Sequence, residues 1–212
     1  MENVFLFGLE LLGTAAFAVS GAMTALGKKM DLFGVAILGV TTAVGGGVLR
    51  DVLTGQTPPA LFRDPTFALA AVLVSLAFFF PSVRRGLTAN HKGWELLLLL
   101  ADSIGLGVFT VVGVKAAMDL SMTAWFASIF LGTITGVGGG VLRDVLAGNT
   151  PYIFIKHIYA CAAIFGAAIC RMLWAPLGER GAMAVGTACI LIVRLLSAHY
   201  RWSLPKAGNI ED

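Results

Sequence analysis

Residues 39–58 read GVTTAVGGGVLRDVLTGQTP, and residues 132–151 read GTITGVGGGVLRDVLAGNTP. At an offset of 93 residues, 15 of the 20 aligned positions are identical. Chance similarity between apolar helices does not produce GGGxxRDxxxG twice, so the match indicates an internal duplication. We therefore expect the chain to build the same structural unit twice.

The match continues upstream at an offset of 92. Five pairs of residues align there: Glu10 with Asp102, Gly13 with Gly105, Phe17 with Phe109, Val19 with Val111, and Gly21 with Gly113. The alignment predicts a first repeat over 1–90 and a second over 91–177, with 178–212 outside the repeat.

Composition indicates a protein of the lipid bilayer. Of the 212 residues, 58% are hydrophobic and 13% are charged, with a mean hydropathy of +0.87, whereas soluble domains carry about 25% charged residues. Seven stretches approach the roughly 20 apolar residues of a spanning helix: 4–26, 32–54, 65–80, 94–118, 122–146, 153–174 and 182–200. We predict an all-α polytopic membrane protein with seven transmembrane helices, three in each repeat and a seventh outside. The small net charge of +3 argues against nucleic-acid binding.

An odd number of helices in each repeat predicts that the second repeat lies upside down relative to the first. Basic residues cluster after the first, third, fifth and seventh predicted helices: Lys28, Lys29, Arg84, Arg85, Lys92, Lys156, Arg201 and Lys206. The opposite connections carry mainly Arg63 and Arg180. The positive-inside rule then predicts that the N-terminus lies outside and the C-terminus in the cytoplasm. We expect a multi-pass protein of the plasma (inner) membrane.

A glycine triplet lies in the middle of the second and of the fifth predicted helix: Gly45, Gly46 and Gly47, then Gly138, Gly139 and Gly140. Glycine costs a helix interior roughly 1 kcal/mol relative to alanine, so we expect each triplet to break or kink its helix. Within a bilayer, unpaired backbone is tolerated only inside protein or beside a wet cavity. A pore or binding site between the triplets is therefore the favoured interpretation, and close packing of small residues is the alternative.

Two threonines precede the triplets by three residues. Thr42 and Thr135 would either offer hydroxyl groups to an ion or bond back to their own helices.

Ionisable residues recur by repeat inside the apolar stretches. Because buried charges cost several kcal/mol unless they are paired or hydrated, we expect these groups to have partners. A helix rises about 1.5 Å per residue, which places Glu10 and Arg50 in one layer of the membrane and Asp102 and Arg143 in the mirror-image layer. We predict a contact within each pair, directly or through water. Arginines that reach out to lipid headgroups are the alternative.

Three further charges have less defined roles. Asp51 and Asp144 either cap a broken half-helix or face the pore, and the sequence does not decide between these roles. Lys115 has no charged counterpart in the first repeat, and it either forms a barrier or extends outward. No catalytic constellation and no metal-ligand spacing emerge, so we expect neither an enzyme nor a cofactor.

The doubled GGGxxRDxxxG motif within seven predicted helices resembles the prokaryotic TRIC family, which are homologues of trimeric intracellular cation channels and have also carried a glycine-transporter label. The resemblance covers nearly the whole chain, from Glu10 to the seventh helix. It implies a homotrimer with one pore inside each protomer, lined by kinked second and fifth helices, that conducts monovalent cations, mainly K⁺. Animal members bind an inositol lipid through a basic residue in the fifth-helix motif. The glycine triplet replaces that pattern here, so lipid binding is not carried over.

Three classes of function follow from these features. A passive K⁺-permeable channel is the preferred hypothesis. A secondary transporter of glycine or another small solute is the main alternative, because inverted repeats with discontinuous helices serve transporters equally well. The third is a structural membrane protein whose glycines serve only helix packing.

Overall fold

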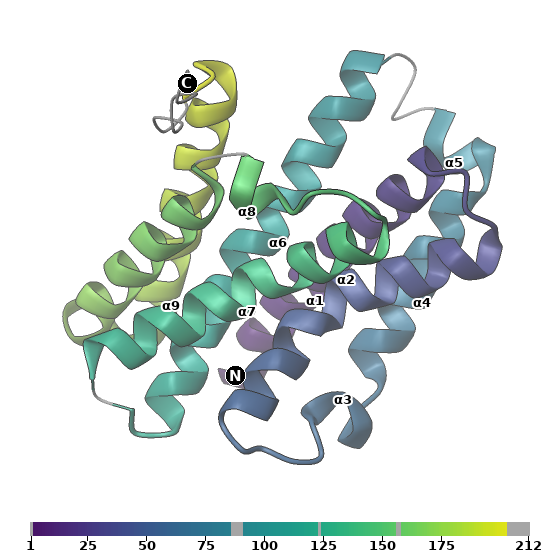
Figure 1. The fold of residues 1–212 in the computed structure, drawn as a ribbon. Helices are drawn as coiled ribbons and strands as arrows, with labels where there is room; N and C mark the ends of the chain where they lie inside the picture. The colour runs from purple at the N-terminus through teal and green to yellow at the C-terminus, as the bar shows by residue number, and fades with distance from the viewer. Residues whose placement is uncertain (1, 86–90, 123, 156–157, 203–212) are drawn as a thin grey trace, which may run out of the picture.

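The computed structural model describes residues 2–85, 91–122, 124–155 and 158–202. Lys156 and Lys206, used above to predict orientation, lie outside these residues. Within the described residues the regular elements are α-helices (Figure 1). The longer ones are α1 (Glu2–Gly27), α2 (Leu32–Leu53), α4 (Thr66–Phe79), α6 (His91–Asp119), α7 (Trp125–Leu146) and α9 (Tyr159–His199). Short helices connect them: α3 (Ala60–Arg63), α5 (Pro81–Arg85) and α8 (Tyr152–Ile155).

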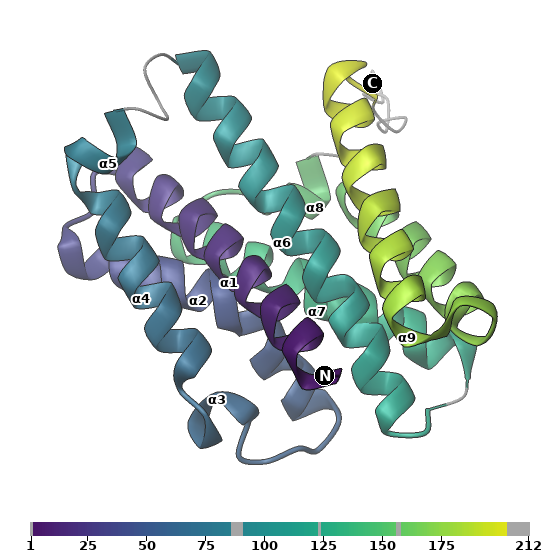
Figure 2. The ribbon, with the colours of Figure 1, turned by 180° about the vertical axis from the view of Figure 1, so that it is seen from behind.

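Helix α9 contains two arms that fold back on each other at Gly178. Gly178 has φ 68° and ψ 174°, a conformation that only glycine adopts readily. A Cβ added to Gly186 would lie 2.8 Å from the Cβ of Cys170, and one added to Gly166 would meet Ile190. The two arms are therefore antiparallel, as Figures 1 and 2 show. The two arms correspond to the predicted sixth and seventh helices, which follow each other through the kink at Gly178 and are therefore described together as α9.

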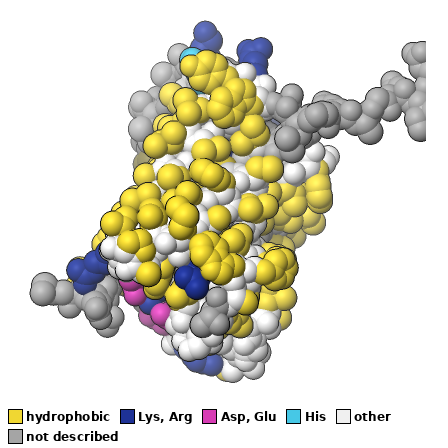
Figure 3. Space-filling model, turned by 90° about the vertical axis from the view of Figure 1, so that its left-hand side faces the viewer, with side chains coloured by type: hydrophobic (Ala, Val, Ile, Leu, Met, Phe, Trp, Pro, Cys, Tyr) yellow, Lys and Arg dark blue, Asp and Glu magenta, His cyan; other side chains and the backbone are white. Residues whose placement is uncertain are grey.

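The helices have the lengths and surfaces of membrane spans. Five segments of the described chain are long and apolar enough to cross a bilayer: Val4–Gly27, Leu32–Leu53, Lys92–Asp119, Trp125–Leu146 and Tyr159–His199. The 14 residues of α4 reach only about 21 Å. Large apolar side chains face outward, including Phe33 at 74% exposure and Phe126 at 77%. On the α9 side, hydrophobic side chains cover most of the surface, and the charged groups lie toward its two ends (Figure 3).

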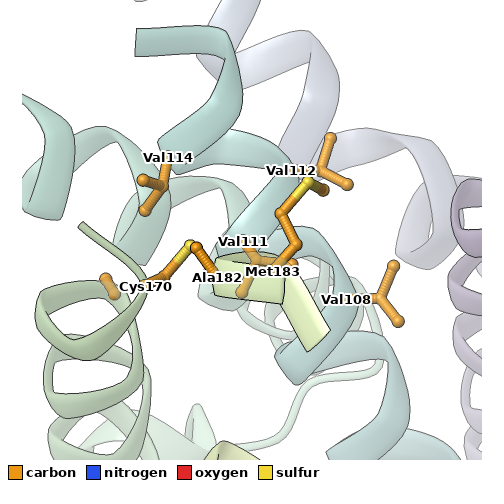
Figure 4. Close-up of a cluster of buried hydrophobic side chains, with 8 residues drawn as sticks. Val108, Val111, Val112, Val114, Cys170, Ala182 and Met183 are labelled. Carbon is orange, nitrogen blue, oxygen red and sulfur yellow. The ribbon is translucent and has the colours of Figure 1, made fainter. Parts of the chain in front are cut away.

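Helix α6 forms the packing centre of the molecule. It contacts α1, α7 and α9, which surround it in both ribbon views (Figures 1 and 2). One apolar cluster joins Val108, Val111 and Val114 of α6 to Cys170 and Met183 on the two arms of α9 (Figure 4). The second arm, which lies outside the repeat, is thus packed directly against the second repeat.

The glycine triplets join α2 to α7 without breaking either helix. The predicted break is wrong, because α2 and α7 are each continuous helices through their triplets. A Cβ on Gly46 would collide with the carbonyl oxygen of Thr135, and one on Gly139 would collide with the carbonyl oxygen of Thr42. The missing side chains let the two backbones touch, and the intact helices leave no backbone group unpaired in an apolar setting.

Equivalent contacts recur on both sides of this crossing. Measured from a Cβ placed on each glycine, the pairs are Gly45 with Leu142, Gly138 with Leu49, Gly21 with Thr42, and Gly113 with Thr135. Along the crossing, residue numbers rise on α2 as they fall on α7, so the two helices are antiparallel where they meet.

Candidate functional site

A cavity of about 220 Å³ enters the molecule beside α3, and we name it the vestibule. Its polar lining includes Glu10 and Thr14 from α1, Arg50 from α2, and Asp64 from the connection between α3 and α4. Asp64 is exposed, whereas Thr14 is only 1% exposed. The vestibule therefore leads from the protein surface into the core.

Two stacked phenylalanines close the inner end of the vestibule. Phe109 lines the cavity, and its ring stacks on that of Phe17 with centroids 5.4 Å apart. Phe17 is 1% exposed and belongs to the apolar core. The two residues are equivalent in the repeat, so each repeat supplies one ring to this barrier.

The charges of the vestibule are arranged differently from the prediction. Arg50 binds its neighbour Asp51, with Nη2 2.7 Å from Oδ1 and Nε donating to the same oxygen at 2.8 Å. Among the described residues, Glu10 has no ion-pair partner within 4.0 Å. The predicted direct Glu10–Arg50 contact is therefore absent, because Arg50 turns to the adjacent carboxylate. Both side chains nevertheless line the same cavity.

Asp64 places a further carboxylate at the vestibule mouth. Its Oδ1 accepts hydrogen bonds from the Thr66 hydroxyl at 2.5 Å and from the Thr66 N–H at 3.0 Å. These bonds stabilise the charged form and lower the pKa of Asp64, so this group is ionised at neutral pH. Together with Glu10 and Asp51, it gives the vestibule three carboxyl groups for the one guanidinium of Arg50.

The layer that holds Asp102 and Arg143, the counterparts of Glu10 and Arg50, is closed to solvent. Arg143 Nη1 lies 2.6 Å from Asp102 Oδ1 and 2.5 Å from Ser20 Oγ, and Nε donates to Asp144 Oδ1 at 2.8 Å. The side chain of Arg143 is 0% exposed and that of Asp102 is 1% exposed. The predicted Asp102–Arg143 contact is confirmed, and Arg143 does not reach the headgroups.

Asp51 and Asp144 have the same structural role in the two repeats. Each binds the preceding arginine through Oδ1. The Oδ2 of Asp51 accepts from the backbone N–H of Ala60 at 2.8 Å, and that of Asp144 accepts from the N–H of Tyr152 at 2.9 Å. The two carboxylates therefore fasten the ends of α2 and α7 to the starts of α3 and α8. The sequence analysis did not predict this role. Neither group caps a broken half-helix, because α2 and α7 are continuous, and Asp51 also lines the vestibule.

Two groups that the sequence analysis did not single out complete the closed layer. The Tyr159 hydroxyl donates to Asp102 Oδ1 at 3.3 Å. Arg194, on the second arm of α9, is 3% exposed, with Nη2 3.7 Å from Asp102 Oδ2 and its guanidinium 4.7 Å from the centre of the Tyr159 ring. An arginine inside the apolar stretch 182–200 was a usable signal, because such charges are rare in spans.

We name Asp102, Arg143, Asp144 and Arg194 the buried charge cluster. It lies toward the α8 end of the molecule, whereas the vestibule opens at the α3 end, and Figures 1 and 2 place these two short helices at opposite ends. Equivalent positions of the two repeats are thus open at one end and sealed at the other.

The two threonines bond to their own helices. The Thr42 hydroxyl donates to the Leu38 carbonyl and that of Thr135 donates to the Leu131 carbonyl, both at 2.6 Å. In this conformation the hydroxyl groups stabilise the helix turn before each triplet.

The remaining predicted residues lie at the edges of these features. Gly47 lines the vestibule, while a Cβ on Gly140 would approach the Tyr159 hydroxyl at 2.9 Å. Lys115 Nζ lies 2.8 Å from Asp119 Oδ2 and 3.5 Å from Glu179 Oε1, so it extends toward the end of α6 and is paired there.

Comparisons with known proteins agree with this architecture. A family model described as "Glycine transporter" matches residues 7–82 and again residues 99–175, which recognises the duplication. The UPF0126 membrane protein of Deinococcus radiodurans is 38% identical over 199 residues, covering 93% of this chain and 89% of the relative. The UPF0126 inner membrane protein YadS of Escherichia coli is 37% identical over 206 residues, covering 95% of this chain and 96% of the relative.

Solved structures share the whole fold. The TRIC trimeric intracellular cation channel orthologue from Rhodobacter sphaeroides is 32% identical, with a TM-score of 0.83 over 93% of this chain and 98% of that one. A structure described in work on conductance through TRIC cation channels is 36% identical, with a TM-score of 0.82 over 94% of this chain and 96% of the other. This chain belongs to the TRIC/UPF0126 family.

Family membership confirms the resemblance predicted from the doubled motif, and it confirms an integral membrane protein with an all-helical TRIC fold. The relatives are described as membrane proteins and as channels.

Proposed function

We propose that this chain is a cation channel whose path runs inside the protomer, between α1, α2, α6 and α7. The observation that carries the proposal is the acidic vestibule, which reaches from the surface to the stacked phenylalanines at the α2–α7 crossing. Three carboxyl groups against one guanidinium raise the local cation concentration. The TRIC structures that share this fold are described as cation channels, which supports the same activity here.

The proposed architecture has seven crossings in two inverted repeats, 1–90 and 91–177, followed by the second arm of α9 and the tail, 178–212. Two family matches support the duplication. The antiparallel contacts between equivalent helices support the inversion: α2 meets α7 at the triplets, while Gly13 of α1 packs on Val108 and Gly105 of α6 packs on Phe17. Each arm of α9 holds about half of its 41 residues, near the roughly 20 that one crossing needs.

The structure corresponds to a closed conformation in this proposal. The Phe17–Phe109 pair and the backbone contacts of Gly46 and Gly139 separate the vestibule from the buried charge cluster. Opening then separates α2 from α7 at the triplets, where the two backbones are in direct contact and where glycine permits bending. Thr42, Thr135 and the six glycines would line the path that this motion exposes.

The proposed permeant ion is K⁺, and the proposed assembly is a homotrimer with one path in each protomer. The second property is supported by the description of the Rhodobacter sphaeroides relative as a trimeric channel. With the N-terminus outside, the vestibule opens to the exterior and the buried charge cluster faces the cytoplasm.

Recording from the purified protein in planar bilayers tests the proposal. Discrete unitary currents in symmetric KCl, with a reversal potential that follows the K⁺ gradient, are the expected result. Saturable glycine uptake into liposomes without unitary currents would instead establish the transporter predicted as the alternative. Silence of folded, reconstituted protein in both assays would favour a packing role for the glycines.

A further inference from the structure

The buried charge cluster contains a cation that the repeat does not supply. By repeat, Asp102 corresponds to Glu10 and Arg143 to Arg50, but Arg194 lies on the second arm of α9, which has no copy in the first half. The first repeat has the open vestibule at this position. In the second repeat, Tyr159 and, from outside the repeat, Arg194 lie against Asp102. The difference between the open and sealed ends therefore involves a residue from outside the repeat.

Arg194 is held loosely for a buried guanidinium. Its nearest charged partner, Asp102 Oδ2, is 3.7 Å away, beyond hydrogen-bond distance. Arg194 Nε and Nη2 and Asp102 Oδ2 are all buried and have no hydrogen-bond partner among the described residues. By contrast, Arg143 is held by Asp102, Asp144 and Ser20 at 2.5–2.8 Å. Arg143 is thus a fixed part of the cluster, and Arg194 is its weakly bound member.

Charge balance indicates what replaces Arg194 when it leaves. With Arg194 in place, two guanidinium groups face the two carboxylates of Asp102 and Asp144. Without it, one carboxylate charge is uncompensated, and a buried charge without a partner is strongly unfavourable. A single monovalent cation restores the balance. Arg194 lies against Asp102 Oδ2, which has no hydrogen-bond partner among the described residues, and against the Tyr159 ring, whose hydroxyl bonds the other oxygen of that carboxylate. Oxygen atoms of these two kinds suit a hard cation.

We propose that Asp102 is a monovalent-cation site at the α8 end of the molecule and that the Arg194 guanidinium is a tethered cation that occupies it in this conformation. Withdrawal of Arg194 with the second arm of α9 exposes the site to ions and water. This inference rests on the proposed channel function, but its test does not require a current.

Chemical labelling measures whether Arg194 seals the site. In a background with Cys161, Cys170 and Cys189 replaced by alanine, Ser20→Cys places a thiol inside the cluster. With Arg194 present, we expect slow reaction with a positively charged, water-soluble thiol reagent. Arg194→Gln should raise the labelling rate at least tenfold, whereas Arg194→Lys should keep the rate low. The control is Arg180→Gln, which removes an exposed positive charge from the same arm and should leave the labelling rate unchanged. Arg194→Met keeps the aliphatic stem and replaces Arg194→Gln if the latter does not fold.

Anomalous scattering from Rb⁺ locates the ion directly. Crystals of the Arg194→Gln protein in RbCl should show an Rb⁺ peak beside Asp102 Oδ2 that the parent protein lacks. An unchanged labelling rate in folded Arg194→Gln or Arg194→Met protein, or no Rb⁺ peak at Asp102, would overturn the proposal. If neither parent nor variant carries unitary current, the channel proposal fails, while labelling and scattering still decide the role of Arg194.

Discussion

The Cα of Gly46 lies against the backbone carbonyl of Thr135, so closely that a Cβ at position 46 would overlap the oxygen. The repeat reproduces this relationship between Gly139 and Thr42. Both contacts join α2 to α7 in the centre of the molecule, and in both the obstacle is backbone, which cannot rotate away as a side chain would. The triplets therefore set the distance between the two helices.

Alanine at either position should force the helices apart. We expect Gly46→Ala and Gly139→Ala each to lower stability by about 1–3 kcal/mol, the usual range for overpacking a core. The midpoint of unfolding of the detergent-solubilised protein measures this effect. Gly8→Ala is the matched control on α1, because nothing lies within 4 Å of its added Cβ. A Gly46→Ala protein as stable as the Gly8→Ala protein would contradict the contact.

Neutralising Glu10 should reduce cation entry. Glu10 lines the vestibule without a direct ion-pair partner among the described residues, so its charge acts on the solution in the cavity. Glu10→Gln should lower unitary K⁺ conductance about two- to tenfold in dilute salt, and less in 1 M salt, where the Debye length falls to about 3 Å. Glu179→Gln, outside the vestibule, is the control. A loss that is equal at both salt concentrations would mean that Glu10 does not act through its field.

The two arginine–aspartate pairs should differ in how much they stabilise the protein. Asp51 and Asp144 make equivalent bonds, but the Arg50 side chain is 17% exposed and the Arg143 side chain is 0% exposed. Asp144→Asn leaves the positive charge of Arg143 incompletely balanced in a sealed core and should lower the free energy of unfolding by about 3–5 kcal/mol. Asp51→Asn beside the vestibule should cost about 1–2 kcal/mol, since water can solvate Arg50. Unfolding in detergent compares the two, and equal losses would show that burial of the arginine is not what matters.

The repeat allowed the sequence to predict most of the fold. An offset of 92 or 93 residues aligns Glu10 with Asp102 and Arg50 with Arg143, and hydropathy gave helix boundaries within a few residues for α2, α4 and α7. The Asp102–Arg143 ion pair followed from depth alone. Hydrophobic periodicity and the length of apolar segments are local properties, so they can be read from the sequence without knowledge of how the helices pack.

Three features of the molecule depended on packing and were not predictable in the same way. Glycine propensity suggested a break at each triplet, but tertiary contact between α2 and α7 outweighs that propensity. The direct form of the predicted Glu10–Arg50 contact is absent, because Arg50 pairs with the adjacent Asp51. Arg194 lies outside the repeat, so no internal comparison pointed to its place beside Asp102.

The stacked rings of Phe17 and Phe109 and the buried charge cluster are two barriers in series along the proposed path. Removing one barrier leaves the other, so Phe109→Ala alone should raise K⁺ efflux from liposomes by no more than about twofold. Combining Phe109→Ala with Arg194→Gln should raise efflux by much more than the product of the two single effects, because the two residues act on one continuous path. Leu69→Ala, on the exposed face of α4, serves as the control for a general loss of packing. If Phe109→Ala alone leaks as much as the double variant, the cluster is not a barrier, and the phenylalanine pair closes the path by itself.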